Sequence, residues 1–123
     1  MNIVDSSCWI DYFGDGVSCN FAEGAIKDTA NLNVPGITIY EVYKKLLLEE
    51  TEYNALLAVA AMKQGKIINL DVELSLSAAK YSIAHKLPMA DAIIYASAKK
   101  FCCTLWTCDK HFKGLDLVNY FEK

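Results

Sequence analysis

The chain has 123 residues, of which 54% are hydrophobic, six are Gly and two are Pro. This length and composition exclude an intrinsically disordered protein and predict a single compact domain over residues 1–123. The net charge of −3 excludes a protein that binds nucleic acid by bulk attraction alone, so any such contact needs a local basic patch, a bound cation, or both.

Apolar runs and turn signals predict strands that alternate with helices. In chain order, the expected elements are a strand at 2–5, helices at 8–13 and about 20–28, a strand at 32–36, helices at 38–48 and 52–65, a strand at 66–71, helices at 72–86 and 88–101, a strand at 102–109, a short turn or helix at 110–114, and a last strand at 116–120. This alternation favours an α/β fold with a parallel sheet covered on both faces.

Some residues are typical of helix ends. Ser6 or Ser7 would cap the first helix, and Thr38 stands three residues before Glu41, which is the spacing of a capping box. Gly65 stands where a glycine commonly ends a helix. We therefore expect Thr38 to open its helix and Gly65 to stop the next one.

Membrane attachment and export are not expected. No apolar run approaches the roughly 18 residues that a membrane-spanning helix needs, and the start, MNIVDSSCWIDYF, lacks the features of a signal peptide. The five cysteines are odd in number and unevenly spaced, which favours reduced thiols over a disulfide framework. These features predict a cytoplasmic protein with no membrane partner.

One carboxylate does not fit its surroundings. Residues 87–101, LPMADAIIYASAKKF, are apolar on nearly every side of the expected helix and still contain Asp91. Burying a carboxylate is costly unless it is paired, hydrogen-bonded or bound to a cation. Asp91 therefore requires a partner.

Four acids are expected to meet at one edge of the sheet, because reactive groups gather at the carboxyl ends of parallel strands and the amino ends of the following helices. Two of these acids come at the ends of expected strands, and the other two lie in the first turns of expected helices. The set, called the four acids below, is Asp5, Asp109, Glu41 and Asp91. Singly, each is also explained as a helix cap or dipole partner. Together they would repel one another, and a hard cation such as Mg²⁺ or Mn²⁺ resolves that repulsion.

The segments around these acids are IVDSSCWIDYF, ITIYEVYKKL, LPMADAIIYASAKKF and LWTCDKHF. In this order and spacing they resemble the four acidic blocks of PIN-domain nucleases, especially the VapC-type toxins of prokaryotic toxin–antitoxin pairs. The resemblance covers nearly the whole chain. It implies a three-layer α/β/α fold with a central, mainly parallel sheet of about four to five strands. It also implies a Mg²⁺- or Mn²⁺-dependent endoribonuclease, in which a cation-activated water hydrolyses RNA to a 5′-phosphate and a 3′-hydroxyl.

The resemblance also assigns roles to single residues. The four acids would be the catalytic residues and metal ligands, with Asp109 completing the pocket. Ser6 and Thr107 resemble hydroxyl residues beside the acids and would orient them by hydrogen bonds. The implied partners are an RNA substrate, a small antitoxin protein and a second copy of the chain. Tyr43, Lys44 and Lys45 follow the glutamate block, where small residues are frequent in the family, so the approach of RNA along that helix is expected to differ.

Two other functions stay open. A phosphoacceptor signalling domain is also a short α/β chain, and Asp71 ends a middle strand where such a domain carries its phosphorylated aspartate. That alternative leaves Glu41 and Asp91 without a role. The other is a catalytically silent PIN fold that acts as a binding module.

The cysteines and one histidine also raise the possibility of a zinc site. Cys102, Cys103, Cys108 and His111 could surround zinc, but adjacent cysteines on a strand point to opposite faces and no C-x-x-C knuckle is present. We expect small buried side chains instead. Neither His85 nor His111 has the neighbours of a nucleophile–base pair, so no catalytic role is assigned to them.

Two apolar groups complete the candidates. Trp9, Tyr12 and Phe13 would stack on RNA bases or, as we favour, pack in the core. The middle helices carry more leucines than one buried face needs, and this surplus would contact an antitoxin or a second copy. These leucines are Leu46, Leu47, Leu48, Leu56 and Leu57.

Overall fold

The computed structural model describes residues 1–123. In chain order, the elements are β1 (Asn2–Val4), α1 (Ser6–Gly14), α2 (Glu23–Lys27), the 3₁₀ helix η1 (Thr29–Asn31), β2 (Leu32–Pro35), α3 (Gly36–Glu49), α4 (Glu52–Met62), β3 (Lys66–Ile68), α5 (Val72–His85), α6 (Met89–Phe101), β4 (Thr104–Thr107), the 3₁₀ helix η2 (Lys110–Phe112) and β5 (Val118–Tyr120). Every expected strand and helix is present, although the strands and the second helix are shorter than expected.

The strands form one sheet in the order β3-β2-β1-β4-β5, and every neighbouring pair is parallel. β1 is central, with β2 on one side and β4 on the other. Because all the strands run in one direction, their carboxyl ends lie along the same edge. The expectation of a mainly parallel sheet is confirmed.

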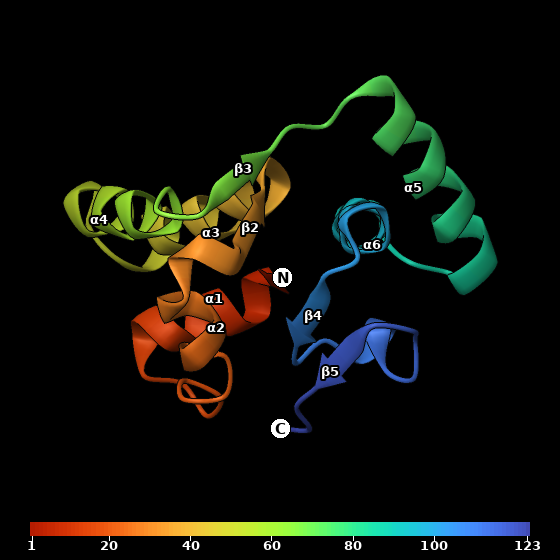
Figure 1. Ribbon diagram of the computed structural model, residues 1–123. Coiled ribbons are helices and arrows are strands. Elements are labelled where there is room, and N and C mark those ends of the chain that lie inside the picture. The colour runs from red at the N-terminus through yellow and green to blue at the C-terminus, as the bar shows by residue number, and fades with distance from the viewer.

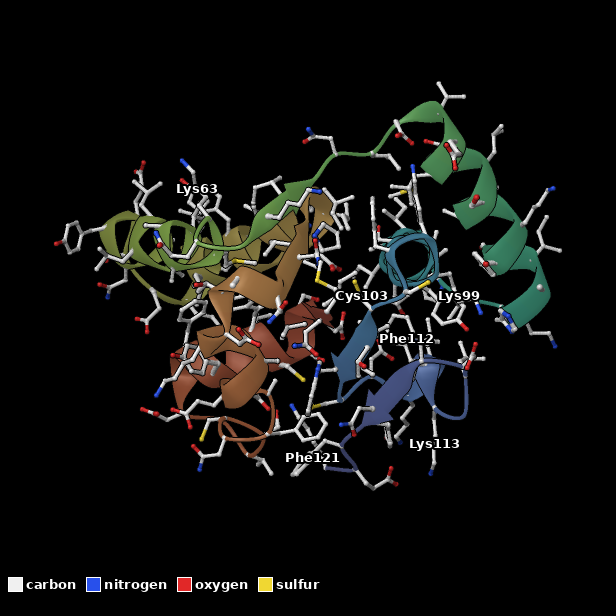
Figure 2. The ribbon with its side chains drawn as sticks, viewed as in Figure 1. Lys63, Lys99, Cys103, Phe112, Lys113 and Phe121 are labelled. Carbon is white, nitrogen blue, oxygen red and sulfur yellow. The ribbon has the colours of Figure 1, made fainter.

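Helices cover both faces of this sheet (Figure 1), with α1 to α4 on one side and α5 and α6 on the other. Adjacent residues of β1 show the division, since Ile3 packs into the core beneath α5 and α6 and Val4 into the core beneath α1 to α4. Phe112 of η2, labelled in Figure 2, belongs to the α5–α6 core and is fully buried. The three-layer α/β/α architecture is therefore confirmed.

The start of α1 differs from the expected one. Asp5 occupies the N-cap position, so Ser6 and Ser7 are the first two helical residues and not caps. The Asp5 side chain makes no capping hydrogen bond. Its carboxylate is instead held by hydroxyl groups, which makes it available for another role.

The expected capping box at Thr38 is wrong. α3 begins two residues earlier, at Gly36, with Pro35 at the N-cap. The Thr38 hydroxyl is buried and donates to the Pro35 carbonyl oxygen at 2.6 Å, a bond that threonine makes inside a helix. Glu41 is consequently in the second turn of α3, and its carboxylate is not used as a cap.

Gly65 does not end α4 either, because the helix ends at Met62 and Lys63 is its C-cap. A Cβ added at Gly65 would lie 2.9 Å from the Leu32 carbonyl oxygen and 2.9 Å from Cγ2 of Val34. Glycine is therefore needed here because the chain passes close to β2 as it enters β3. None of the helices has the length and apolar character that crossing a bilayer requires.

Candidate metal centre

Sheet topology brings segments that are far apart in the sequence to one place. Asp5 follows β1 and Asp109 follows β4, and these two strands are neighbours. Asp91 lies in the first turn of α6, which packs against β4, β2 and α3. Glu41 lies on α3, which follows β2, the other neighbour of β1. The four acids therefore come from four elements around the carboxyl end of β1.

Asp5 is the most enclosed of the four acids, at 1% exposed. Its Oδ2 accepts hydrogen bonds from the hydroxyls of Ser7, at 2.7 Å, and Thr107, at 2.9 Å. Its Oδ1 is buried and has no hydrogen-bond partner. A buried carboxylate oxygen without a donor is costly, so Oδ1 is placed to receive a positively charged ligand.

Asp91 and Asp109 share a contact with a third side chain, His111. His111 Nδ1 lies 2.7 Å from Asp109 Oδ1 and 3.3 Å from Asp91 Oδ2. The backbone N–H of His111 also donates to Asp109 Oδ1 at 2.9 Å, where Asp109 caps η2. One potential ligand atom from each of these three residues falls within 4.8 Å of the others.

A hydrogen bond connects Glu41 to Ser6, the residue that follows Asp5. The Ser6 hydroxyl donates to Glu41 Oε1 at 3.0 Å. The charges of Asp5 and Asp109 both raise the pKa of Glu41, although its burial is the larger cause. Glu41 is therefore electrostatically part of the same cluster.

Burial and mutual repulsion make the cluster hold protons. Burial, together with the charges of Asp109 and Asp5, raises the pKa of Asp91 to about 8. The pKa of Asp5 is also raised, mainly by burial, although the hydroxyls of Ser7 and Thr107 oppose the change. A cation would displace these protons and remove the repulsion.

The two expected hydroxyl residues are both in contact with the acids. The Ser6 hydroxyl donates to Glu41 and not to its chain neighbour Asp5. Thr107 donates to Asp5 and accepts from the backbone N–H of Asp109 at 2.9 Å, so it connects the two acids of β1 and β4. These pairings depend on which helix and strand lie opposite each hydroxyl.

Sequence reasoning missed Ser7 and His111. Ser7 binds Asp5 and accepts from the N–H of Cys108 at 3.2 Å. A signal for Ser7 was its place two residues after a strand-ending aspartate, where a hydroxyl can turn back to the carboxylate. A signal for His111 was its place two residues after Asp109, at the same edge of the sheet. The absence of a nucleophile beside it led to its rejection, although metal ligation needs no nucleophile.

Replacing Thr107 with Val should weaken Mn²⁺ binding by about 10- to 100-fold, because Asp5 loses one of its two donors and the Asp109 N–H loses its acceptor. Valine has nearly the same shape as threonine and lacks only the hydroxyl, so the side chain still fills the fully buried site. Calorimetric titration with Mn²⁺ measures the effect. Thr104→Val, at the opposite end of β4, is the control and should bind Mn²⁺ as the wild type does. Equal affinity in the Thr107 variant would contradict the proposed orienting role.

The alternative phosphoacceptor site is not supported by the position of Asp71. Asp71 caps α5, with its Oδ1 accepting from the N–H of Leu74 at 2.8 Å, and it follows the edge strand β3. Its pKa is lowered, chiefly by that backbone hydrogen bond. Asp71 is thus an exposed helix cap outside the acidic cluster.

The remaining candidates separate into core and surface. Cys8, Cys103 and Cys108 are buried, Cys102 is exposed, and no cysteine joins the group of potential metal ligands, so the zinc alternative is not supported.

Trp9 is 1% exposed and stacks on Phe13 with ring centroids 5.6 Å apart, as expected for core packing. Of the surplus leucines, only Leu46 is buried. The others are exposed on α3 and α4, and they are Leu47, Leu48, Leu56 and Leu57.

One protein-family model matches residues 3–117, and its description is PIN domain. This range covers nearly the whole chain and contains the four acids. The chain belongs to the PIN domain family. The family resemblance predicted from the acidic blocks is thereby confirmed. A search of curated protein sequences finds no match to this PIN domain.

Solved structures share the same PIN fold. A toxin–antitoxin complex from Klebsiella pneumoniae has a TM-score of 0.83 and 23% sequence identity, covering 97% of this chain and 96% of that one. VapC20 of Mycobacterium tuberculosis, described as a sarcin–ricin loop cleaving toxin, has a TM-score of 0.76 and 17% identity, covering 91% of this chain and 92% of that one. VapBC2 of Rickettsia felis, bound to a promoter DNA fragment, has a TM-score of 0.75 and 12% identity, with 98% of both chains covered.

The residues of this PIN domain fit a divalent cation. The buried Oδ1 of Asp5 has no partner in the protein, and oxygen atoms of Asp91 and Asp109 converge near Nδ1 of His111. Carboxylate oxygens are the preferred ligands of Mg²⁺ and Mn²⁺. The donor set is thus of the right chemical kind, and the enclosed carboxylates gain the most from such an ion.

Proposed function

We propose that this PIN domain is a metal-dependent endoribonuclease and the toxin of a toxin–antitoxin pair. The observation that carries the proposal is the unpartnered, buried Oδ1 of Asp5 within the cluster of the four acids. A protein that binds no ligand at such a place rarely retains such a group, because each buried carboxylate without a counter-charge lowers the stability of the fold. A nuclease site explains why the chain tolerates it.

The four acids would hold Mg²⁺ or Mn²⁺. Such a cation lowers the pKa of a water molecule, orients the phosphodiester and stabilises charge on the leaving oxygen. The chain's own part is to fix the ligands: Ser7 and Thr107 hold Asp5, and Ser6 holds Glu41. Acids that are held by hydrogen bonds and at least partly buried keep their geometry when the substrate binds.

A groove beside Glu41 supports RNA as the substrate. A cavity of about 280 Å³ is lined by Ser6, Glu41, Tyr40 and Lys44, among others. Tyr40 is 58% exposed, and Lys44 Nζ lies 5.7 Å from its ring centre. Lys44 has no carboxylate within ion-pair distance, whereas Lys45 pairs with Glu49 at 2.6 Å. An exposed aromatic ring beside a free ammonium group suits a nucleobase and its phosphate.

The surface of α3 and α4 supports a protein partner. The four exposed leucines on these helices make an apolar surface that a second protein could cover. The toxin–antitoxin complexes that share the fold favour an antitoxin as that partner. A second copy of the chain would bury exposed apolar residues in the same way, and we therefore also propose a homodimer.

Purified protein should cleave RNA with Mn²⁺ and should not cleave it with EDTA. Product ends should be a 5′-phosphate and a 3′-hydroxyl, because hydrolysis by an activated water breaks the bond to the 3′ oxygen. Structured and single-stranded RNAs are compared on gels with end-labelled substrate. The control variant is Asp15→Asn, because Asp15 is exposed and its φ of 53° suits asparagine. This variant is purified in the same way and should cleave RNA at the wild-type rate.

Two failures of this assay would have different meanings. If Mn²⁺ raises the melting temperature but no RNA is cleaved, the metal site exists and the silent binding module becomes the better description. If Mn²⁺ changes neither the melting temperature nor cleavage, the proposed metal site is absent and the acids have a structural role.

A further inference from the structure

A histidine lies inside the group of carboxylates, and the family match does not assign it a role. His111 Nδ1 is 2.7 Å from Asp109 Oδ1 and 3.3 Å from Asp91 Oδ2, and the three atoms lie within 4.8 Å of one another. It is the only basic side chain within ion-pair distance of either carboxylate. The imidazole nitrogen therefore lies beside both of the carboxylates that would hold the cation.

We propose that His111 supplies Nδ1 as a nitrogen ligand to the divalent cation, beside Asp91 and Asp109. This inference rests on the proposed function, since it adds one ligand to the same site. It changes the chemistry of the centre from an all-oxygen donor set to a mixed nitrogen and oxygen set.

Local structure holds the ring where ligation requires it. His111 lies in the middle of η2, between Lys110 and Phe112. Phe112 is fully buried in the α5–α6 core, which anchors η2 to α6 and hence to Asp91. The hydrogen bond from the backbone N–H of His111 to Asp109 Oδ1 fixes the position of His111 relative to Asp109. Backbone and core contacts thus place the imidazole between the two acids without using the ring itself.

The exposure of His111 favours a ligand over a structural residue. Its side chain is 52% exposed, whereas that of Asp91 is 11% exposed. A half-exposed ring contributes little to the core, so packing does not explain its position. Its polar contacts are with two acids that would hold the cation, and Nδ1 can exchange its hydrogen bond for a bond to the ion.

A nitrogen ligand has a consequence for metal preference. Imidazole suits Co²⁺, Ni²⁺ and Mn²⁺ better than Mg²⁺, which prefers oxygen ligands and water. The wild type should therefore bind Co²⁺ more tightly than Mg²⁺ by a margin that depends on His111. Any all-oxygen site also ranks Co²⁺ above Mg²⁺, so the decisive quantity is the change in this margin when His111 is replaced.

Pulsed electron paramagnetic resonance of the full chain loaded with Mn²⁺ tests the ligand directly. The chain has two histidines, His85 and His111. We expect imidazole ¹⁴N coupling in the wild type and in His85→Ala, and its loss in His111→Ala. Labelling histidine with ¹⁵N should shift the same signal. Mn²⁺ bound without imidazole coupling, or coupling that persists in His111→Ala, would overturn the proposal.

Calorimetric titration separates ligation from hydrogen bonding. His111→Ala and His111→Asn should both lower Co²⁺ affinity by at least about tenfold and Mg²⁺ affinity by less than about threefold. Asn keeps a side-chain donor beside Asp109, so a wild-type Co²⁺ affinity in His111→Asn would show that hydrogen bonding suffices and would overturn ligation. Melting in EDTA checks that both variants fold, as the half-exposed position predicts.

The same titration distinguishes failure of this inference from failure of the proposed function. Binding of Mn²⁺ without a nitrogen ligand removes only the role of His111. No binding of Mn²⁺, Co²⁺ or Mg²⁺ to the wild type overturns both the ligand and the metal centre.

Discussion

Replacing Asp91 with Asn should lower the rate of RNA cleavage by at least about 10³-fold and should raise the melting temperature of the metal-free chain. The loss of activity follows because a metal ligand is removed, and metal catalysis is worth several kcal/mol of barrier. The gain of stability follows because Asp91 is buried and its charge is opposed by that burial and by the charges of Asp109 and Asp5. Asparagine has the same shape without that charge.

The opposite signs of these two effects distinguish a functional acid from a structural one. Cleavage is measured with Mn²⁺, and melting is measured by circular dichroism with EDTA at pH 8. Asp15→Asn, on the exposed surface after α1, should change neither quantity. A lower melting temperature of Asp91→Asn in EDTA would mean that the carboxylate stabilises the fold, which would remove the argument for a cation.

The metal-free chain should lose about 2–4 kcal/mol of unfolding free energy as the pH rises from 5 to 8. Folding raises the pKa of Asp91 to about 8, whereas an unfolded aspartate titrates near pH 3.9. Between these values the folded chain binds a proton that the unfolded chain has released. The stabilisation is therefore full below about pH 4 and is lost as the pH approaches 8. The raised pKa values of Asp5 and Glu41 act in the same direction.

Other acids do not obscure this window. Hydrogen bonds and lysine partners lower the pKa of Asp11, Asp71, Asp116 and Glu122. Their contributions are lost only as the pH falls below about 4, which is outside the range of 5 to 8.

Urea unfolding in EDTA at several pH values measures the predicted slope, and two comparisons test its cause. In Asp91→Asn most of the slope should disappear. In the wild type with saturating Mn²⁺, stability should no longer fall toward pH 8, because the cation binds the deprotonated acids of the folded chain. A slope that is the same in Asp91→Asn and the wild type would assign the pH dependence to other groups.

The sequence by itself determined the layout of the fold. Alternating strands and helices predicted the parallel sheet, and Asp91, as a charge in an apolar helix, predicted a site that needs a counter-charge. The acidic blocks predicted the PIN domain family, which the family match confirmed. These features are readable because residue type, local periodicity and chain order need no knowledge of what lies across the sheet.

Only the tertiary structure decided how the acids are held. Thr38 has a capping-box spacing, yet it bonds backward to Pro35 because α3 begins earlier where it leaves β2. Thr107 reaches Asp5 because β4 lies beside β1, and His111 reaches Asp91 because η2 packs against α6. A hydrogen bond between residues separated by 102 positions depends on which strands are neighbours. That adjacency is set by burial of the two cores as a whole, so no local pattern in the sequence encodes it.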